Sequence, residues 1–157
     1  MQPDPMPIRN SVGIIIDDGT NWILQERDKK DGILWSGKIS MWGGVQELAD
    51  ESDSHKNAIR ELYEETGIDE AQAKLVCYGN LSFEHQTLQE QLVRQNVSLY
   101  VAHVESGMFF HTYEGQSAHK IPRMPELEKL DMADYAPGTS EAIEKLMEYN
   151  KHEQTAA

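Results

Sequence analysis

Hydrophobic and polar residues alternate in several short stretches near the start of the chain. The stretches 12–16 and 22–24 place an apolar side chain at every second position, and residues 17–20 between them read Asp-Asp-Gly-Thr. Alternation on both sides of a turn-forming sequence predicts an early β-hairpin. A third short strand is expected over residues 38–42, which ends at the pair Gly43-Gly44.

The period becomes helical between residues 54 and 66. Ser54 is the candidate N-cap of this helix, and Gly67 stands where helices commonly end. Two later apolar runs, 75–83 and 96–104, have the length and composition of strands and are expected to form an antiparallel pair.

No period persists over residues 105–125, and so long an irregular segment in a compact domain is more often a functional loop. Leu127 and Leu130 then suggest a short helix, and a last amphipathic helix opens at Ser140. Strands on either side of a central helix, followed by another helix, predict a mixed α+β fold.

The chain has 157 residues, of which 39% are hydrophobic, a size and mix that fit one compact domain. Residues 1–8 hold three prolines, and the last seven residues are mostly polar. We therefore expect a flexible N-terminal extension (1–8), a single domain (9–150) and a flexible C-terminal tail (151–157).

The net charge of −13 comes from 14 Lys and Arg against 27 Asp and Glu, which argues against a nucleic-acid polymer as partner and favours a small ligand. No apolar run reaches the roughly 18 residues that a membrane span needs, and the start lacks the features of a signal peptide. A cytoplasmic protein without a membrane partner is expected. Cys77 is the single cysteine and is expected to be a buried thiol.

Three glutamates of the predicted helix share one face. At about 100° per residue, Glu64 and Glu65 lie within about 60° of Glu61, while the apolar side chains lie on the opposite side. Like charges at these spacings repel by a few tenths of a kcal/mol per pair, so either solvent or a bound cation must offset the repulsion. An exposed acidic surface and a cation-binding face both fit this pattern.

Segment 60–68, Arg-Glu-Leu-Tyr-Glu-Glu-Thr-Gly-Ile, resembles the second half of the signature of the Nudix hydrolases, Gly-x5-Glu-x7-Arg-Glu-U-x-Glu-Glu-x-Gly-U, with U a bulky aliphatic residue. It matches at every specified position. The interval from Gly44 to Arg60 is two residues longer than in the pattern. The acid in the middle of the signature is therefore Glu51, Asp50 or Glu47, and the insertion is expected to lengthen the loop without moving the helix.

The resemblance extends to the order of elements after the signature. Members of the family often carry an acidic residue in a late loop, and Glu114-Gly115-Gln116 occupies that place here. The fold that the resemblance implies is an α/β/α sandwich with a mixed β-sheet and the signature helix beside it.

The resemblance implies a Mg²⁺ cofactor, with Mn²⁺ as a substitute. Carboxylates are the hard oxygen donors that Mg²⁺ prefers, whereas zinc would lack its usual Cys and His ligands. A cation would also reverse the local negative charge that repels a diphosphate. The implied ligands are Gly43, through its carbonyl, and Glu61, Glu64, Glu65 and Glu114.

The reaction implied by the resemblance is attack of water on a phosphorus of a diphosphate linkage. Glu61 is the first candidate for activating or orienting the water, with Arg60 holding a carboxylate beside it, and Glu114 is the second candidate. Arg27 is a candidate for binding a substrate phosphate, and Gln116 is a weaker candidate for binding the substrate.

The function implied first is hydrolysis of a nucleoside diphosphate linked to another moiety, such as a nucleotide sugar or dinucleotide. Two alternatives stay open: a nucleoside triphosphate pyrophosphohydrolase of house-cleaning type, and a Nudix-fold module that binds a nucleotide without cleaving it. A homodimer is compatible with the resemblance. Trp35 and Trp42 flank the approach to the glycine pair and are candidates for stacking on a base, although core packing is expected of Trp42.

Overall fold

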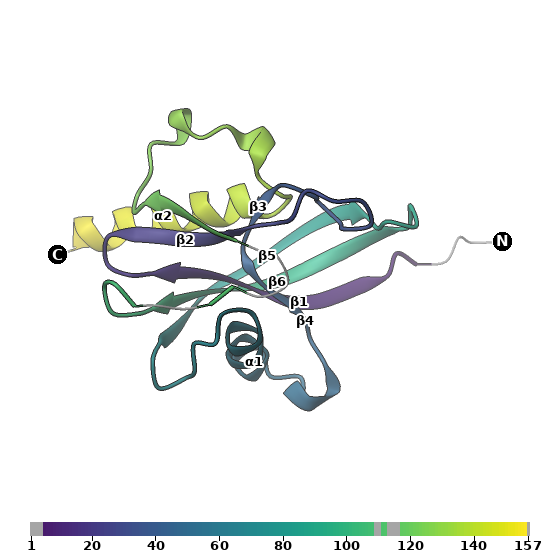
Figure 1. The fold of residues 1–157 in the computed structure, drawn as a ribbon, viewed down its shortest axis with the longest axis horizontal. Coiled ribbons are helices and arrows are strands. Elements are labelled where there is room, and N and C mark those ends of the chain that lie inside the picture. Colours follow the sequence, from purple (N-terminus) through teal and green to yellow (C-terminus); the bar gives the residue numbers. More distant parts are fainter. Residues whose placement is uncertain (1–4, 109–110, 113–116, 157) are drawn as a thin grey trace.

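The computed structural model describes residues 5–108, 111–112 and 117–156, with side chains as far as His152. A mixed β-sheet lies between two helices, with α1 (Ser54–Thr66) on one face and α2 (Thr139–Ala156) on the other (Figure 1). The expected α+β class and the α/β/α sandwich are confirmed. Within the described residues, no helix is both long enough and apolar enough to cross a bilayer.

The central part of the sheet has the strand order β3-β2-β1-β6-β5, with β4 paired to β1 and β7 paired to β2. Strands β1 and β6 run parallel over ten residue pairs, and the other pairings between these strands are antiparallel. The strands are β1 (Ile8–Asp17), β2 (Asn21–Glu26), β3 (Ile39–Ser40), β4 (Trp42–Val45), β5 (Lys74–Gln86), β6 (Leu92–His103) and β7 (Ser117–Pro122).

The early hairpin and the later antiparallel pair are confirmed as β1/β2 and β5/β6. The expected strand over 38–42 is instead two strands, β3 and β4. The chain pairs with β2 as far as Ser40 and pairs with β1 from Trp42 onward. The cap of α1 is also different: the side chain of Asp53, one residue before Ser54, accepts the backbone N–H of His55 at 2.9 Å.

Residues 105–125 contain a strand that the sequence did not indicate. Strand β7 pairs with β2 through six residues, and Ile121 is its one buried side chain, so it shows no clear alternation. Cys77 was expected to be buried but is exposed, because it lies on β5 at the edge of the sheet. Strand β1 begins at Ile8 and α2 runs to Ala156, close to the expected domain start and six residues past its expected end.

Two hydrophobic clusters, one on each face of the sheet, fix the helices. Leu62 of α1 is 1% exposed and packs in a cluster that contains Ile14 and Trp42. Ile143 and Leu146 of α2 pack in the second cluster. Burial of one such side chain stabilises the fold by roughly 1.5–3 kcal/mol. Because Leu62 faces the sheet, the acidic face of α1 lies beside β4.

Candidate active site

The glutamates of α1 meet the glycine pair of β4 at close range. The backbone N–H of Gly43 donates a hydrogen bond to Oε2 of Glu65 at 2.9 Å. A Cβ atom added to Gly44 would lie 2.4 Å from Oε1 of Glu61, so only glycine lets this carboxylate approach the strand. Glu61 is buried, Glu65 is partly buried and Glu64 is exposed, so the three acids reach from the interior to the surface.

Burial makes the inner carboxylates more basic than usual. Desolvation raises the pKa of Glu65 to about 7, against the opposing hydrogen bond from Gly43, and the charge of Glu61 adds to the rise. Desolvation also raises the pKa of Glu61, although Arg60 opposes this shift. A cation at this place would relieve the cost of holding both carboxylates ionised.

Arg60 ties the loop after β4 to the helix. Its Nε donates to Oδ1 of Asp50 at 3.0 Å and its Nη2 to Oδ2 at 2.9 Å, a bidentate pair that lowers the pKa of the Asp50 carboxyl. Its Nη1 donates to Glu61 Oε1 and Glu64 Oε2, both at 3.0 Å. One guanidinium therefore positions the loop and two of the three glutamates.

These contacts decide which acid stands in the middle of the signature. Asp50 is separated from Gly44 by five residues, the spacing of the pattern, and it holds Arg60. Glu51 instead pairs with Lys56 at the surface. The two extra residues therefore follow Asp50, in a turn where Glu51 and Ser52 have φ angles of 52° and 60°. The longer loop leaves the contacts of Arg60 in place.

The donor set of this site suits a hard divalent cation. Glu61, Glu64 and Glu65 offer only carboxylate oxygens, the ligands that Mg²⁺ binds in proteins. In the part of the chain that the structure describes, no three acidic, histidine or cysteine side chains stand close enough to hold an ion together. Two further predicted site residues, Glu114 and Gln116, lie outside the described residues.

A cleft of about 230 Å³ lies beside the glutamates. Its lining includes the glycine pair, Arg27 and the rings of Trp35 and Phe83. Arg27 donates from Nε to the carbonyl of Leu34 at 2.8 Å, and its charge acts on Glu65. Cationic and aromatic groups thus line one space beside the glutamates, which suits a ligand with both phosphates and a ring.

The two tryptophans differ in burial. Both border the cleft, but Trp35 is only partly buried, whereas Trp42 is fully buried in the core and donates from Nε1 to the carbonyl of Ile23 at 3.1 Å. The expected core role of Trp42 is confirmed.

Sequence reasoning missed most of the cleft lining. The missed residues come from three strands and belong to no recognised sequence motif. They are Phe83 and His85 of β5, Gln25 of β2 and Ser40 of β3. One signal was present: Gln25 continues the buried face that Ile23 begins two residues earlier, so a polar side chain stands where an apolar one is expected.

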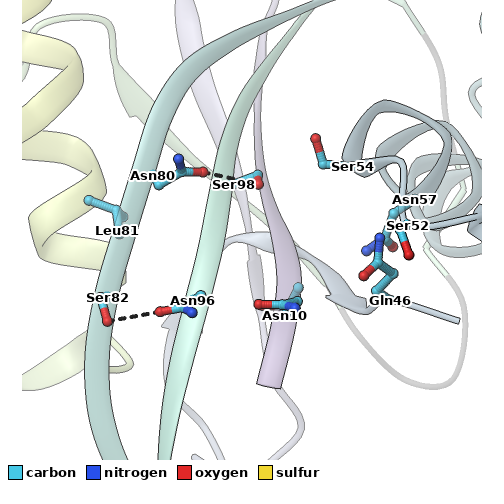
Figure 2. Close-up of a pocket in the computed structure, with 11 residues that line it drawn as sticks. Asn10, Gln46, Ser52, Ser54, Asn57, Asn80, Leu81, Ser82, Asn96 and Ser98 are labelled. Carbon is cyan, nitrogen blue, oxygen red and sulfur yellow. Dashed lines mark hydrogen bonds between the residues drawn. The ribbon is translucent and has the colours of Figure 1, made fainter. Parts of the chain in front are cut away.

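A second hollow, of about 420 Å³, lies between α1 and strands β1, β5 and β6 (Figure 2). Its lining holds no charged residue and none of the predicted site residues. Its polar groups bind one another: Ser98 donates to Asn80 at 3.1 Å and Ser82 donates to Asn96 at 3.0 Å. The features that suit phosphate chemistry are therefore gathered in the first cleft.

Comparisons with known proteins agree with this geometry. The family model described as NUDIX domain matches residues 7–146. A MutT protein from Methanosarcina mazei Go1 has a similar structure, with a TM-score of 0.67 and 19% identity, over 95% of this chain and 99% of the other. A search of curated proteins finds no match to the sequence.

Two further solved structures share the fold. An Ap4A hydrolase from C. elegans has a TM-score of 0.64 at 16% identity, over 92% of this chain and 98% of the other. The NUDIX domain of Shewanella oneidensis NrtR, solved with ADP ribose, has a TM-score of 0.63 at 13% identity, over 93% and 89%. The family match covers most of the chain and includes every described residue of the glutamate site. The chain therefore belongs to the NUDIX domain family, and it is a hydrolase that acts on pyrophosphate bonds.

Proposed function

We propose that this protein hydrolyses, with Mg²⁺, the diphosphate linkage of a nucleoside diphosphate joined to another moiety, such as a nucleotide sugar or dinucleotide. The observation that carries the proposal is that the glutamate face of α1 and the cleft meet at the glycine pair of β4. The inner carboxylates of Glu61 and Glu65 contact the glycine pair, and this pair also lines a cleft with a cationic and an aromatic wall.

The metal would be held by Glu61, Glu64 and Glu65, whose carboxylates would have to move closer together to share it, with the carbonyl of Gly43 and the carboxylate of Glu114 as further ligands. When bound, Mg²⁺ supplies charge neutralisation for the phosphates and lowers the pKa of a bound water. Mn²⁺ is expected to substitute, because it accepts the same hard oxygen donors.

The chain's own residues have distinct roles in this proposal. Glu61 orients the attacking water or takes its proton, since its buried carboxylate lies against the glycine pair that lines the cleft. Arg60 is a positioning residue, because its Nη1 holds Oε1 of Glu61. Arg27 binds a phosphate from the wall of the cleft. Glu114 as second base and Gln116 as substrate ligand stay predictions.

Two relatives favour the linked substrate class over a nucleoside triphosphate. The cleft, with both Arg27 and aromatic rings, can hold the diphosphate and base that both classes share. One structural neighbour is named as an Ap4A hydrolase and another was solved with ADP ribose, and both molecules are nucleotides joined through phosphates to a second moiety. The cytoplasmic location and the homodimer stay predictions.

The test is a substrate panel with purified protein. ADP-ribose, UDP-glucose, Ap4A and the nucleoside triphosphates are incubated with Mg²⁺, and the products are separated and quantified. We expect the linked substrates to be cleaved faster than the triphosphates. Faster release of pyrophosphate from a triphosphate would favour the house-cleaning alternative, and binding without turnover of any compound would favour a non-catalytic module.

Variants test whether the activity depends on the glutamates. Glu64→Gln and Glu65→Gln are each expected to lower turnover by about 100-fold or more, since each removes a charged oxygen ligand. Glu144→Gln is the matched control, because Glu144 is exposed on α2, across the sheet from the site. Unchanged hydrolysis in both site variants would exclude the proposed centre.

A further inference from the structure

Two buried polar atoms, on residues that line the cleft, have no hydrogen-bond partner within the protein. Among the described residues, Oε1 of Gln25 and Oγ of Ser40 are the buried side-chain atoms for which no hydrogen bond is found. Both residues are well inside the protein, at 2% and 6% exposure, and both line the cleft beside Arg27. Leaving such atoms unpaired destabilises a fold, so their presence in the cleft calls for a functional explanation.

The two side chains are neighbours with fixed roles. Gln25 of β2 and Ser40 of β3 are directly paired in the antiparallel register, so their side chains stand on the same face of the sheet. Nε2 of Gln25 donates to the carbonyl of Met41 at 2.8 Å, which leaves Oε1 as the free end of the amide. The pair therefore offers one acceptor beside one hydroxyl that can donate or accept.

Other polar groups in the same cleft satisfy each other. Nε2 of Gln95 donates to Oγ of Ser11 at 2.7 Å, and Oε1 of Gln95 lies 3.2 Å from Nε2 of His85. The fold thus supplies partners for its polar residues a short distance away. A group that enters the cleft from outside would supply the partner that Gln25 and Ser40 lack.

The chemistry of the pair limits what that group is. A phosphate at neutral pH carries no donor for Oε1 of Gln25, so the phosphates belong elsewhere. Arg27 stands two residues further along the same extended chain, roughly 7 Å away, and is suited to them. The rings of Trp35 and Phe83 line the same cleft and suit a flat ring with an N–H on its edge.

We infer that Gln25 and Ser40 select the substrate by hydrogen-bonding the edge of its nucleobase. Gln25 Oε1 accepts an N–H of the base, and Ser40 Oγ bonds to the adjacent position. This inference rests on the proposed function, which supplies a nucleotide as the ligand. It makes the pair a determinant of specificity that takes no part in bond cleavage.

Ser40→Ala and Gln25→Met test the pair through KM, kcat and Tm with the panel substrate of lowest KM. Each variant is expected to raise KM about 5- to 20-fold and to change kcat less than about threefold. Ser40→Ala should leave Tm unchanged or higher, because it deletes an unpaired buried hydroxyl. The matched control is Ser82→Ala, which removes a paired hydroxyl outside the cleft and should leave KM unchanged.

Substrate analogues identify the contacted group. Wild-type protein should bind analogues without the base donor more weakly: N6,N6-dimethyladenine, 1-methylguanine or 3-methyluracil in place of the parent base. The Gln25→Met variant should bind each analogue with the same affinity as the parent compound. If wild-type protein instead binds the base analogues as tightly as their parents but binds a 2′-deoxyribose analogue more weakly, the assignment to the base is overturned.

Failure of this inference differs from failure of the proposed function. If the panel is hydrolysed while KM is unchanged in both variants, the pair has no role in specificity and the proposed function stands. If no compound is hydrolysed, the proposed function fails. Calorimetric binding of ADP-ribose to wild type and Ser40→Ala then judges the pair, with equal affinities overturning it and a weaker variant supporting it.

Discussion

The close approach of β4 to α1 makes Gly44→Ala a sensitive probe of the site. The new Cβ would lie 2.4 Å from Oε1 and 2.7 Å from Cδ of Glu61, distances that non-bonded atoms do not tolerate. Gly44 has an ordinary backbone conformation, so alanine adds no backbone strain. The substitution therefore acts on the Glu61 carboxylate and on little else.

The size of the effect follows from the required displacement. Relief of the overlap moves Oε1 of Glu61 by at least about 0.6 Å, and a misplacement of about 1 Å at a reacting group costs up to about 100-fold in rate. We expect kcat to fall about 10- to 100-fold. KM should change less than about threefold, because the substrate groups that bind in the cleft are untouched.

The assay is steady-state hydrolysis of the best panel substrate with Mg²⁺, together with Tm of each variant. Gly19→Ala, in the β1–β2 turn away from the site, is the control for destabilisation alone: its Cβ meets nothing within 4 Å, but its φ of 91° makes alanine strained, so Tm should fall while kcat stays unchanged. A folded Gly44→Ala protein with kcat within threefold of wild type would refute the reasoning that the Glu61 position controls the rate.

Three further predictions test the scaffold and the metal. Leu62→Ala should lower the free energy of unfolding by about 3–5 kcal/mol in urea denaturation, because it opens a cavity at a side chain 1% exposed; a change below about 1 kcal/mol would contradict this packing. Asp50→Asn should lower kcat and hasten proteolysis of the loop after β4, whereas Glu51→Gln should behave as wild type; the reverse order would make Glu51 the anchor. EDTA should abolish hydrolysis and added Mn²⁺ should restore it, whereas activity retained in EDTA would exclude a metal enzyme. Mg²⁺ at a concentration 100-fold above its Kd should raise the free energy of unfolding by about 2.7 kcal/mol.

Local pattern predicted the parts of the fold that local interactions determine. Helix α1 was predicted with its observed bounds because its period lies within the helix and the Gly67 that ends it follows directly in sequence. Strand β7 escaped prediction because its pairing with β2 defines it, and one buried residue leaves no alternation to read. The exposure of Cys77 likewise depends on which strand forms the sheet edge, a property of topology alone.

The candidate site divides in the same way. The spacing of the three glutamates predicted their shared helix face, because three and four residues make one turn. Asp50 has the spacing of the signature from Gly44, but no acid has its spacing from Arg60, so the hydrogen bonds were needed to choose Asp50 over Glu47 and Glu51. The cleft brings together side chains from distant segments, which no single window of sequence contains.

The most direct test of the central claim is a titration of the protein with Mn²⁺. Electron paramagnetic resonance measures the concentration of free Mn²⁺, and its decrease reports binding to the glutamate face. Wild-type protein and Glu144→Gln should both reduce the free Mn²⁺ signal, because both retain the carboxylates of α1. Glu65→Gln should leave more Mn²⁺ free. Equal free Mn²⁺ in wild type and Glu65→Gln would contradict the claim that these glutamates hold the catalytic cation.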